Sequence, residues 1–507
     1  MGMRKTMCTF VLCLASAVVA YSQTNPIPTI AQPLVPSAVA PGDANFTLTI
    51  HGTGFVVDSV VLWNGQPRVT TLVSNTQLKV TILASDIKKA TTGHITVQNP
   101  TPGGGVSPAA FLPVRTPAAA VNFTLVPEKN SATAFPQNDQ LLTQAIDVNN
   151  DGTLDLIWTP NSNENTGASA QQVNVQLGKE NGSFRTAIGT EAFQGVFVVG
   201  YGDFNGDGNI DLIVEGASVL QQNPHLLAVM LGNGDGTFHA PQQIADPATV
   251  PGPFDEPISQ GSVAVADLNG DGKLDIVYAN TFTVMGVTVL FGNGDGTFTA
   301  GGQFATDSFP AQVGLADVNQ DGKLDLVLAG AQPFLGETRS VVEVLLGNGD
   351  GTFAAEQVVP GTQKSLTGSA QPANFAVADF NGDGIPDLVY FSPDQAEMYL
   401  GNGDGTFAAP LGMPVSSIST VTFLGDFNGD GKLDLLTQAG VLLLGNGDGT
   451  FSVGFNMENL VPNPSIPFVD VIGDFNDDGE IDGATVVHGN NNGVPTAAIN
   501  ILKQVAP

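Results

Sequence analysis

The sequence predicts an all-β protein, and three of its features agree on this. Glycine and proline are plentiful, with 61 and 33 copies among 507 residues, as is typical of chains rich in strands and turns. A nine-residue acidic loop recurs seven times, at intervals of 47 to 64 residues, and short apolar runs flank each copy. Repeats with a period of this size predict a propeller or a solenoid.

The first residues predict export. Residues 1–22 begin with the basic pair Arg4 and Lys5 and continue with an apolar stretch that is too short to span a bilayer. This pattern is typical of a secretory signal peptide, and we expect cleavage after Ala20 or Ser22. Both cysteines of the chain lie in this segment, so the mature chain has neither disulfides nor cysteine zinc sites.

Residues 27–115 predict a small domain of their own, which a linker at residues 116–120 separates from the rest. Short alternating runs are divided by turns rich in Gly, Pro and Asn, which predicts a small β-sandwich. Gly-Thr-Gly-Phe at 52–55, Val-Leu-Trp-Asn-Gly at 61–65 and Asn-Thr-Gln-Leu at 75–78 resemble the IPT/TIG domain, an immunoglobulin-like fold. The resemblance implies a spacer or contact module, and we expect the tryptophan of the second motif in the core.

The loop at residues 203–211, Asp-Phe-Asn-Gly-Asp-Gly-Asn-Ile-Asp, represents the repeated unit. Its three carboxylates repel one another unless a cation lies between them. Oxygen donors at alternate positions, with a glycine for the sharp turn at position 6, are what Ca²⁺ requires. The loop resembles the start of an EF-hand loop, but Val214 stands where that motif has its closing acid. We therefore expect position 9 to close the coordination; an acidic turn without metal is the alternative.

All seven loops keep Asp at positions 1, 5 and 9, Asn at 3 and Gly at 6. We expect up to seven Ca²⁺, each bound by these side chains and by the carbonyl of position 7, with water completing the shell. The expected metal-binding residues are Asp147, Asn149, Asp151, Thr153, Asp155, Asp203, Asn205, Asp207, Asn209, Asp211, Asp267, Asn269, Asp271, Lys273, Asp275, Asp317, Asn319, Asp321, Lys323, Asp325, Asp379, Asn381, Asp383, Ile385, Asp387, Asp426, Asn428, Asp430, Lys432, Asp434, Asp474, Asn476, Asp478, Glu480 and Asp482. In the last loop, Asp477 at position 4 adds a further negative charge.

The runs around each loop predict four strands per repeat. The loop joins two apolar runs, and a third run leads into Gly-Asn-Gly-Asp-Gly-Thr-Phe, a strong hairpin signal. A fourth run follows the phenylalanine, which we expect to pack between blades. The turn recurs at 232–238, 292–298, 347–353, 401–407 and 445–451, with a looser copy at 178–184.

Four strands joined by hairpins make one propeller blade. We therefore expect a seven-bladed β-propeller of four-stranded blades over residues 121–507, preceded by the small sandwich. The last repeat is one strand short, and we expect residues 121–126 to complete its blade and close the ring. Loop and turn together resemble the FG-GAP/VCBS repeat family, whose propeller is similar to the head of integrin α chains. In that family the calcium loop joins the first two strands of a blade.

Catalytic motifs were not found. The five histidines are scattered, no Gly-x-Ser-x-Gly elbow exists, and the mature chain lacks a thiol. The net charge of −32 disfavours a nucleic-acid partner, and the three recurring Asp of each loop account for 21 of the 48 acidic residues. We expect no catalytic residue, no membrane span, and a secreted or cell-surface binding or adhesion module for a glycan or protein. An extracellular polysaccharide lyase or sugar oxidoreductase, or a purely structural surface protein, are the alternatives.

Loop lengths predict where a ligand binds. The calcium loops and glycine-rich turns share one end of the blades and hardly vary, whereas the connections at the other end differ widely in length. The long connections are 161–172, 242–260, 332–340 and 356–374. Variable loops on a rigid scaffold are typical of a recognition surface. We expect the ligand at this variable-loop face; functionless insertions are the alternative.

Overall fold

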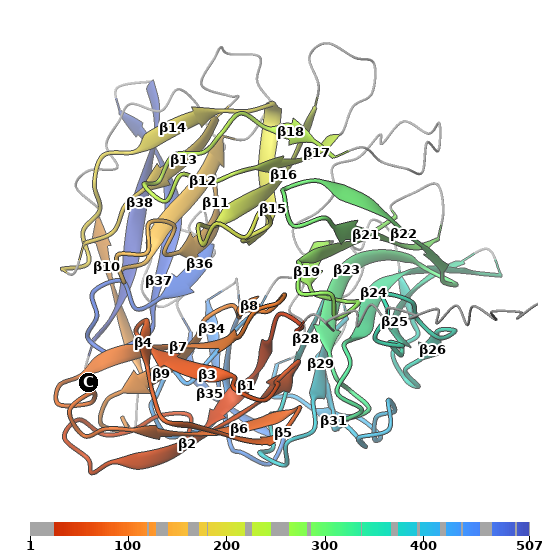
Figure 1. Cartoon of the computed structure of the whole chain (residues 1–507), viewed down its shortest axis with the longest axis horizontal. Coiled ribbons are helices and arrows are strands. Elements are labelled where there is room, and N and C mark those ends of the chain that lie inside the picture. The colour runs from red at the N-terminus through yellow and green to blue at the C-terminus, as the bar shows by residue number, and fades with distance from the viewer. Residues whose placement is uncertain are drawn as a thin grey trace, which may run out of the picture.

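Two β-sheet regions follow one another in the computed structural model, which shows no helix among the residues that it describes (Figure 1). The described residues are 25–118, 121–127, 140–160, 172–179, 181–217, 226–244, 263–280, 285–335, 337–366, 374–392, 396–415, 422–437, 440–456, 469–491 and 494–505. The predicted signal peptide lies outside this part of the chain.

The N-terminal region is a pair of antiparallel sheets around one core. The first sheet runs in the order β1 (Thr29–Val35), β2 (Phe46–Thr53), β6 (Gln77–Ile82) and β5 (Thr70–Ser74). The second runs β4 (Gln66–Pro67), β3 (Val60–Trp63), β7 (Thr91–Asn99) and β8 (Gly105–Val106), with β9 (Ala110–Val114) also on β7. In β6, Leu78, Val80 and Ile82 are buried while the residues between them are exposed, as expected of a strand with one face on a core. Trp63 is buried in the same core, which confirms that prediction.

The rest of the described chain forms seven further sheets, arranged around a propeller-like ring in Figure 1. Six of them follow the sequence order. These are β11 (Gln140–Ile146), β12 (Asp155–Pro160), β13 (Gln172–Gln176) and β14 (Ile188–Glu191); β15 (Gln194–Gly202), β16 (Asp211–Ala217), β17 (Leu226–Met230) and β18 (Gln242–Gln243); β19 (Val263–Ala266), β20 (Asp275–Ala279), β21 (Gly286–Gly292) and β22 (Phe298–Ala305); β23 (Phe309–Ala316), β24 (Asp325–Phe334), β25 (Glu337–Leu345) and β26 (Gln357–Val358), with β27 (Lys364–Leu366) also on β25; β28 (Asn374–Ala378), β29 (Asp387–Phe391), β30 (Ala396–Tyr399) and β31 (Leu411–Gly412); and β32 (Thr422–Gly425), β33 (Asp434–Thr437), β34 (Val441–Gly445) and β35 (Phe451–Asn456).

The seventh sheet combines both ends of the repeat region. It runs β36 (Val471–Gly473), β37 (Asp482–Asn491), β38 (Val494–Val505) and β10 (Asn122–Pro127). β10 pairs antiparallel with β38 from Asn122↔Val505 to Pro127↔Asn500. The prediction that the segment at 121–126 supplies the missing strand is therefore confirmed.

Cores lie between consecutive sheets, and aromatic pairs connect neighbouring repeats. Phe298, from the turn of one repeat, stacks edge-on against Phe204 in the loop of the repeat before it, with ring centroids 5.6 Å apart. Phe184, in the turn of the first repeat, makes the same contact at 5.8 Å with Phe475 in the loop of the last. The predicted packing of these phenylalanines between repeats is confirmed, and the last pair places the first and last repeats side by side.

One of the predicted variable loops is wrong. Residues 332–340 form a continuous hairpin, because β24 and β25 pair up to Phe334↔Glu337 and leave only a tight connection. Most of 161–172 and 242–260 lies outside the described residues. Part of 356–374 forms β26 and β27, and residues 367–373 lie outside the described part of the chain.

Candidate metal centres

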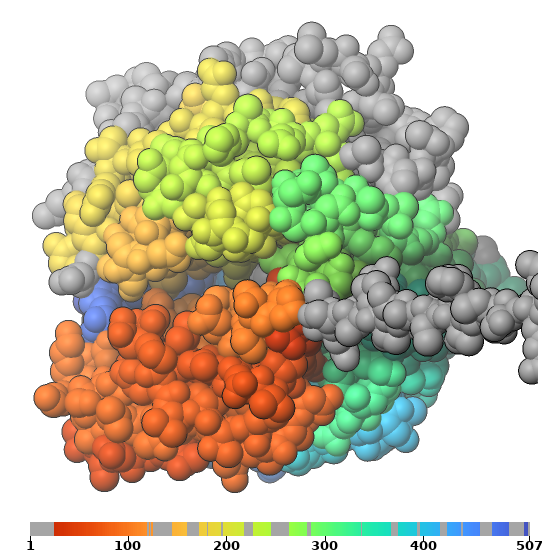
Figure 2. Space-filling view, in the orientation of Figure 1, coloured from red at the N-terminus to blue at the C-terminus, as the bar shows by residue number. Residues whose placement is uncertain are grey.

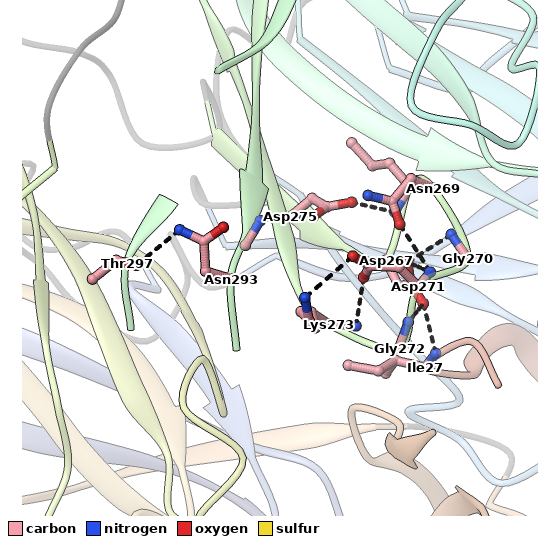
Figure 3. A network of polar contacts seen from close by, with 12 residues as sticks. Ile27, Asp267, Asn269, Gly270, Asp271, Gly272, Lys273, Asp275, Asn293 and Thr297 are labelled. Atoms are coloured by element: carbon pink, nitrogen blue, oxygen red, sulfur yellow. Dashed lines mark hydrogen bonds and ion pairs between the residues drawn. The ribbon is translucent and has the colours of Figure 1, made fainter. Parts of the chain in front are cut away.

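The seven loops share one backbone conformation, which the carboxylate at position 1 organises. Asp203 accepts hydrogen bonds from the amides of Gly206 (2.7 Å), Asp207 (3.1 Å) and Gly208 (2.8 Å). Figure 3 shows the corresponding contacts around Asp267. The glycine at position 6 has a φ between +81° and +88° in every loop, a region that residues with a Cβ enter at a cost of about 1–2 kcal/mol. The loop sequence thus places oxygen donors from positions 1, 3 and 5 on one turn.

The carboxylate at position 9 joins the loop to the glycine-rich turn of its own repeat. One oxygen of Asp275 accepts the amide of Leu268, at position 2, and the other accepts the amide of Gly292, which opens the turn; both distances are 2.9 Å. The same two bonds recur in the first six repeats. The turn amides belong to Gly178, Gly232, Gly292, Gly347, Gly401 and Gly445.

The last repeat has no such turn, and the amide of Gln504 on β38 donates to Asp482 instead, at 2.8 Å. We call the two hydrogen bonds accepted by the position-9 carboxylate the clasp. Because the clasp joins the loop to the turn, it explains why loop and turn recur together. Sequence reasoning assigned position 9 to metal alone and missed the clasp, although the fixed pairing of the two motifs was its signal.

All seven position-9 carboxylates are completely buried. Burial, with a further contribution from the carboxylates at positions 1 and 5, raises their pKa. The raised values are about 7 for Asp155 and Asp275, about 6 for Asp211, Asp325 and Asp387, and about 8 for Asp434 and Asp482. Within the described residues no basic side chain forms an ion pair with any of them. A cation beside positions 1, 5 and 9 would compensate these charges, so the donor set fits Ca²⁺.

Positions 3 and 5 divide the loops into two groups. In three loops the amide of position 3 donates to the carboxylate of position 5, as Asn205 does to Asp207 at 3.0 Å. In the other four a lysine lies 3.6 to 3.8 Å from position 5, as Lys273 does from Asp271. Over the described part of the chain, no three acidic, histidine or cysteine side chains converge as a ready-made metal cluster.

The extra charge of the last loop is directed away from the predicted metal position. Asp477 has a φ of +56°, and its carboxylate accepts a hydrogen bond from the Thr91 hydroxyl of the N-terminal region. Two other loops also lack glycine at position 4, and there Asn150 and Gln320 donate to the position-6 carbonyl of the next loop, at 3.2 and 3.1 Å. Position 4 therefore bridges to a neighbouring element.

A buried acid outside the loops was not identified from the sequence. Glu343 on β25 is fully buried and accepts a hydrogen bond from the Ser308 hydroxyl at 2.7 Å. Burial raises its pKa to about 7, and the charges of Glu356 and Asp307 add to the effect. An acid in an apolar strand was the only available signal. One acid with a serine partner defines no reaction.

Comparison with known families identifies both regions. The FG-GAP-like repeat matches residues 147–214, 218–278, 267–328, 334–390 and 379–437, which together cover more than half of the chain. The chain therefore belongs to the FG-GAP-like repeat family. Residues 32–112 match the IPT/TIG domain, as their motifs predicted. No match was found among curated proteins.

Three solved structures illustrate the range of similar folds. A lectin of Agrocybe aegerita, described as recognising non-reducing terminal N-acetylglucosamine, is 19% identical with a TM-score of 0.44, covering 78% of this chain and 94% of its own. The exotype rhamnogalacturonan lyase YesX is 12% identical with a TM-score of 0.44, covering 95% and 91%. An auxiliary nutrient binding protein of Bacteroides ovatus is 13% identical with a TM-score of 0.29, covering 81% and 97%. In the described chain, no helix has the length and apolarity to cross a membrane.

Proposed function

We propose that this protein is an exported, calcium-binding, seven-bladed propeller that serves as a binding or adhesion module for an extracellular glycan or protein. The calcium binding in this proposal rests on the buried carboxylate at position 9. It recurs in seven loops beside two further carboxylates, and within the described residues it forms no ion pair with a basic side chain. Membership of the FG-GAP-like repeat family supports the same reading.

The loop residues have separate roles in this proposal. Positions 1, 5 and 9 would supply carboxylate oxygens, position 3 an amide oxygen and position 7 a main-chain carbonyl, because hard oxygen donors suit Ca²⁺. Hydrogen bonds from loop amides orient the carboxylates at positions 1, 5 and 9. Bound calcium would offset the repulsion among them and stiffen this end of each blade.

Ligand binding is proposed for the opposite end of the blades. The N-terminal region lies against the calcium-loop end, where Ile27 donates its amide to Asp267 at 2.9 Å and Ala118 donates to the carbonyl of Asn428 at 2.8 Å. That end is therefore partly occupied by the chain itself. The connections at 242–260 and 356–374 remain the proposed recognition surface.

The test uses a panel of immobilised polysaccharides and cell-surface proteins, scored for retention and for product release. We expect retention without release, and its loss when 242–260 and 356–374 are shortened to two-residue turns while calcium content stays the same. Released oligosaccharide would instead support the enzyme alternative. Retention that survives both deletions would refute the proposed face.

A further inference from the structure

The N-terminal region covers five of the seven calcium loops, within the residues that the structure describes. The space around the glycine at position 6 shows which loops are covered, because an added Cβ there would meet the N-terminal region only in a covered loop. A Cβ on Gly272 would lie 2.6 Å from the Asn25 carbonyl oxygen, and one on Gly479 would lie 2.8 Å from that of Val114. A Cβ on Gly152 or Gly208, in the first two loops, would meet nothing within 4 Å. The covered loops are those that begin at Asp267, Asp317, Asp379, Asp426 and Asp474.

In four of the five covered loops the contact includes hydrogen bonds to atoms that shape the loop. Ile27 donates to the position-1 carboxylate of Asp267, and the amide of Asp379 donates to the Gln32 carbonyl at 3.3 Å. Ala118, in the linker that follows the N-terminal sheets, donates to the carbonyl of Asn428, and Asp477 accepts from Thr91. Figure 2 shows the N-terminal region, in red and orange, seated against the propeller. Because these hydrogen bonds end on atoms of the loops, the position of the N-terminal region depends on the conformation of the loops.

A buried arginine adds charge to the same interface. Arg115 directs one nitrogen to the Phe427 carbonyl, and its other two nitrogens are buried without a hydrogen-bond partner. Burial lowers its pKa, while Asp426 and Glu480 oppose that shift. The loop at residues 426–434 contains three Asp and one Lys, so Arg115 faces a loop with a net charge of −2 before metal binds.

We propose that docking of the N-terminal region and calcium binding by the five covered loops are thermodynamically coupled. This inference rests on the calcium binding proposed above. Without metal, the carboxylates at positions 1, 5 and 9 repel one another, which weakens the loop conformation that the docking contacts require. Coupling is reciprocal, so a docked N-terminal region raises the calcium affinity of the loops beneath it. The loop at Asp203, whose position-6 glycine has nothing within 4 Å of an added Cβ, stands outside this coupling.

Hydrogen exchange of the full-length mature chain tests the first half of the proposal. The amides of Ile27 and Ala118 donate across the interface, so their protection reports docking. We expect at least tenfold slower exchange in millimolar Ca²⁺ than in EGTA. The amides of Leu48 and Val80, inside the N-terminal core, should not change, which shows that this region stays folded.

The chain offers a matched pair of variants. The loops at Asp379 and Asp203 have the same hydrogen-bond pattern, including the amide of position 3 on the carboxylate of position 5, at 2.9 and 3.0 Å. Of these two loops, only the one at Asp379 is covered by the N-terminal region. Asp383→Asn should speed exchange at Ile27 and Ala118 in limiting Ca²⁺, whereas Asp207→Asn should not. Equal effects of the two variants would overturn the coupling.

The reverse direction is tested by calorimetric calcium titration. Asn75 packs against Gly322 from the N-terminal side, so Asn75→Trp should push that region off without altering a loop residue. We expect Asn75→Trp to weaken the calcium affinity of the covered loops at least fivefold. Val57→Trp, at an exposed position of the same region, is the control. If the chain binds calcium, but calcium leaves the protection of the interface amides unchanged and Asn75→Trp leaves the calcium affinity unchanged, this inference alone is refuted. A lack of any calcium binding would refute the proposed function as well.

Discussion

Replacing two glycines of identical backbone conformation separates loop strain from domain docking. Gly479 and Gly208 both have a φ of +86° and both occupy position 6. Alanine should therefore cost about 1–2 kcal/mol of backbone strain at either site. At Gly479 the new Cβ would also lie 2.8 Å from the Val114 carbonyl oxygen and 2.9 Å from that of Thr91. These are main-chain atoms that cannot rotate away.

Overpacking of this kind costs about 1–3 kcal/mol, which corresponds to roughly a 5- to 150-fold shift in the docking equilibrium. We expect Gly479→Ala to speed exchange at the interface amides of Ile27 and Ala118 by that factor, in saturating Ca²⁺. Gly208→Ala should leave both amides unchanged, because nothing lies within 4 Å of its Cβ. The same exchange rate in both variants would show that the N-terminal region does not rest on this loop.

Three further predictions concern single elements. The carboxyl of Glu343 has a raised pKa of about 7, so its ionisation destabilises the fold as pH rises from about 4.5 through 7, by up to about 3 kcal/mol. Glu343→Gln should raise the melting temperature at pH 8 and leave it unchanged near pH 4; equal shifts at both would contradict this. Asp275→Asn leaves one acceptor oxygen for two amides, and an unsatisfied amide costs about 1–3 kcal/mol, so the amide of Gly292 should exchange about 5- to 150-fold faster. Asp271→Asn, which is outside the clasp, is the control. An unchanged exchange rate at Gly292 in Asp275→Asn would refute the clasp. Deleting 121–126 removes β10 from β38, so the amides of 500–505, which lie opposite β10, should lose protection. Equal protection with and without the segment would rule out closure.

Much of the repeat region could be predicted from the sequence, because its local signals and its packing agree. Loop and turn each fix a hairpin through their glycines, and the apolar runs between them became strands at the expected places. Closure through β10 followed from counting strands, since the last repeat lacked one. The hairpin at 332–340 was misjudged because its polar and proline-containing sequence resembles a loop, whereas pairing with β25 extends the strand.

The candidate sites were predictable in position but not in their contacts. Asp275 was identified as a ligand, yet its hydrogen bonds to Leu268 and Gly292 depend on how two motifs meet in space. Likewise, the docking of Thr91 onto Asp477 joins residues almost 400 positions apart. No local pattern encodes such a pairing, so the sequence showed Asp477 only as a further negative charge in the last loop.

The most direct test of the account is the calcium content of the mature protein, measured by equilibrium dialysis and elemental analysis together with thermal melting. We predict up to seven Ca²⁺ per chain, with dissociation constants of about 10⁻⁴–10⁻³ M, as in extracellular modules. At 10 mM Ca²⁺ each occupied site should then add about 1.4–2.7 kcal/mol to the stability of its blade, and EGTA should lower the melting temperature. A chain that holds no calcium and melts at the same temperature in EGTA would contradict the central claim.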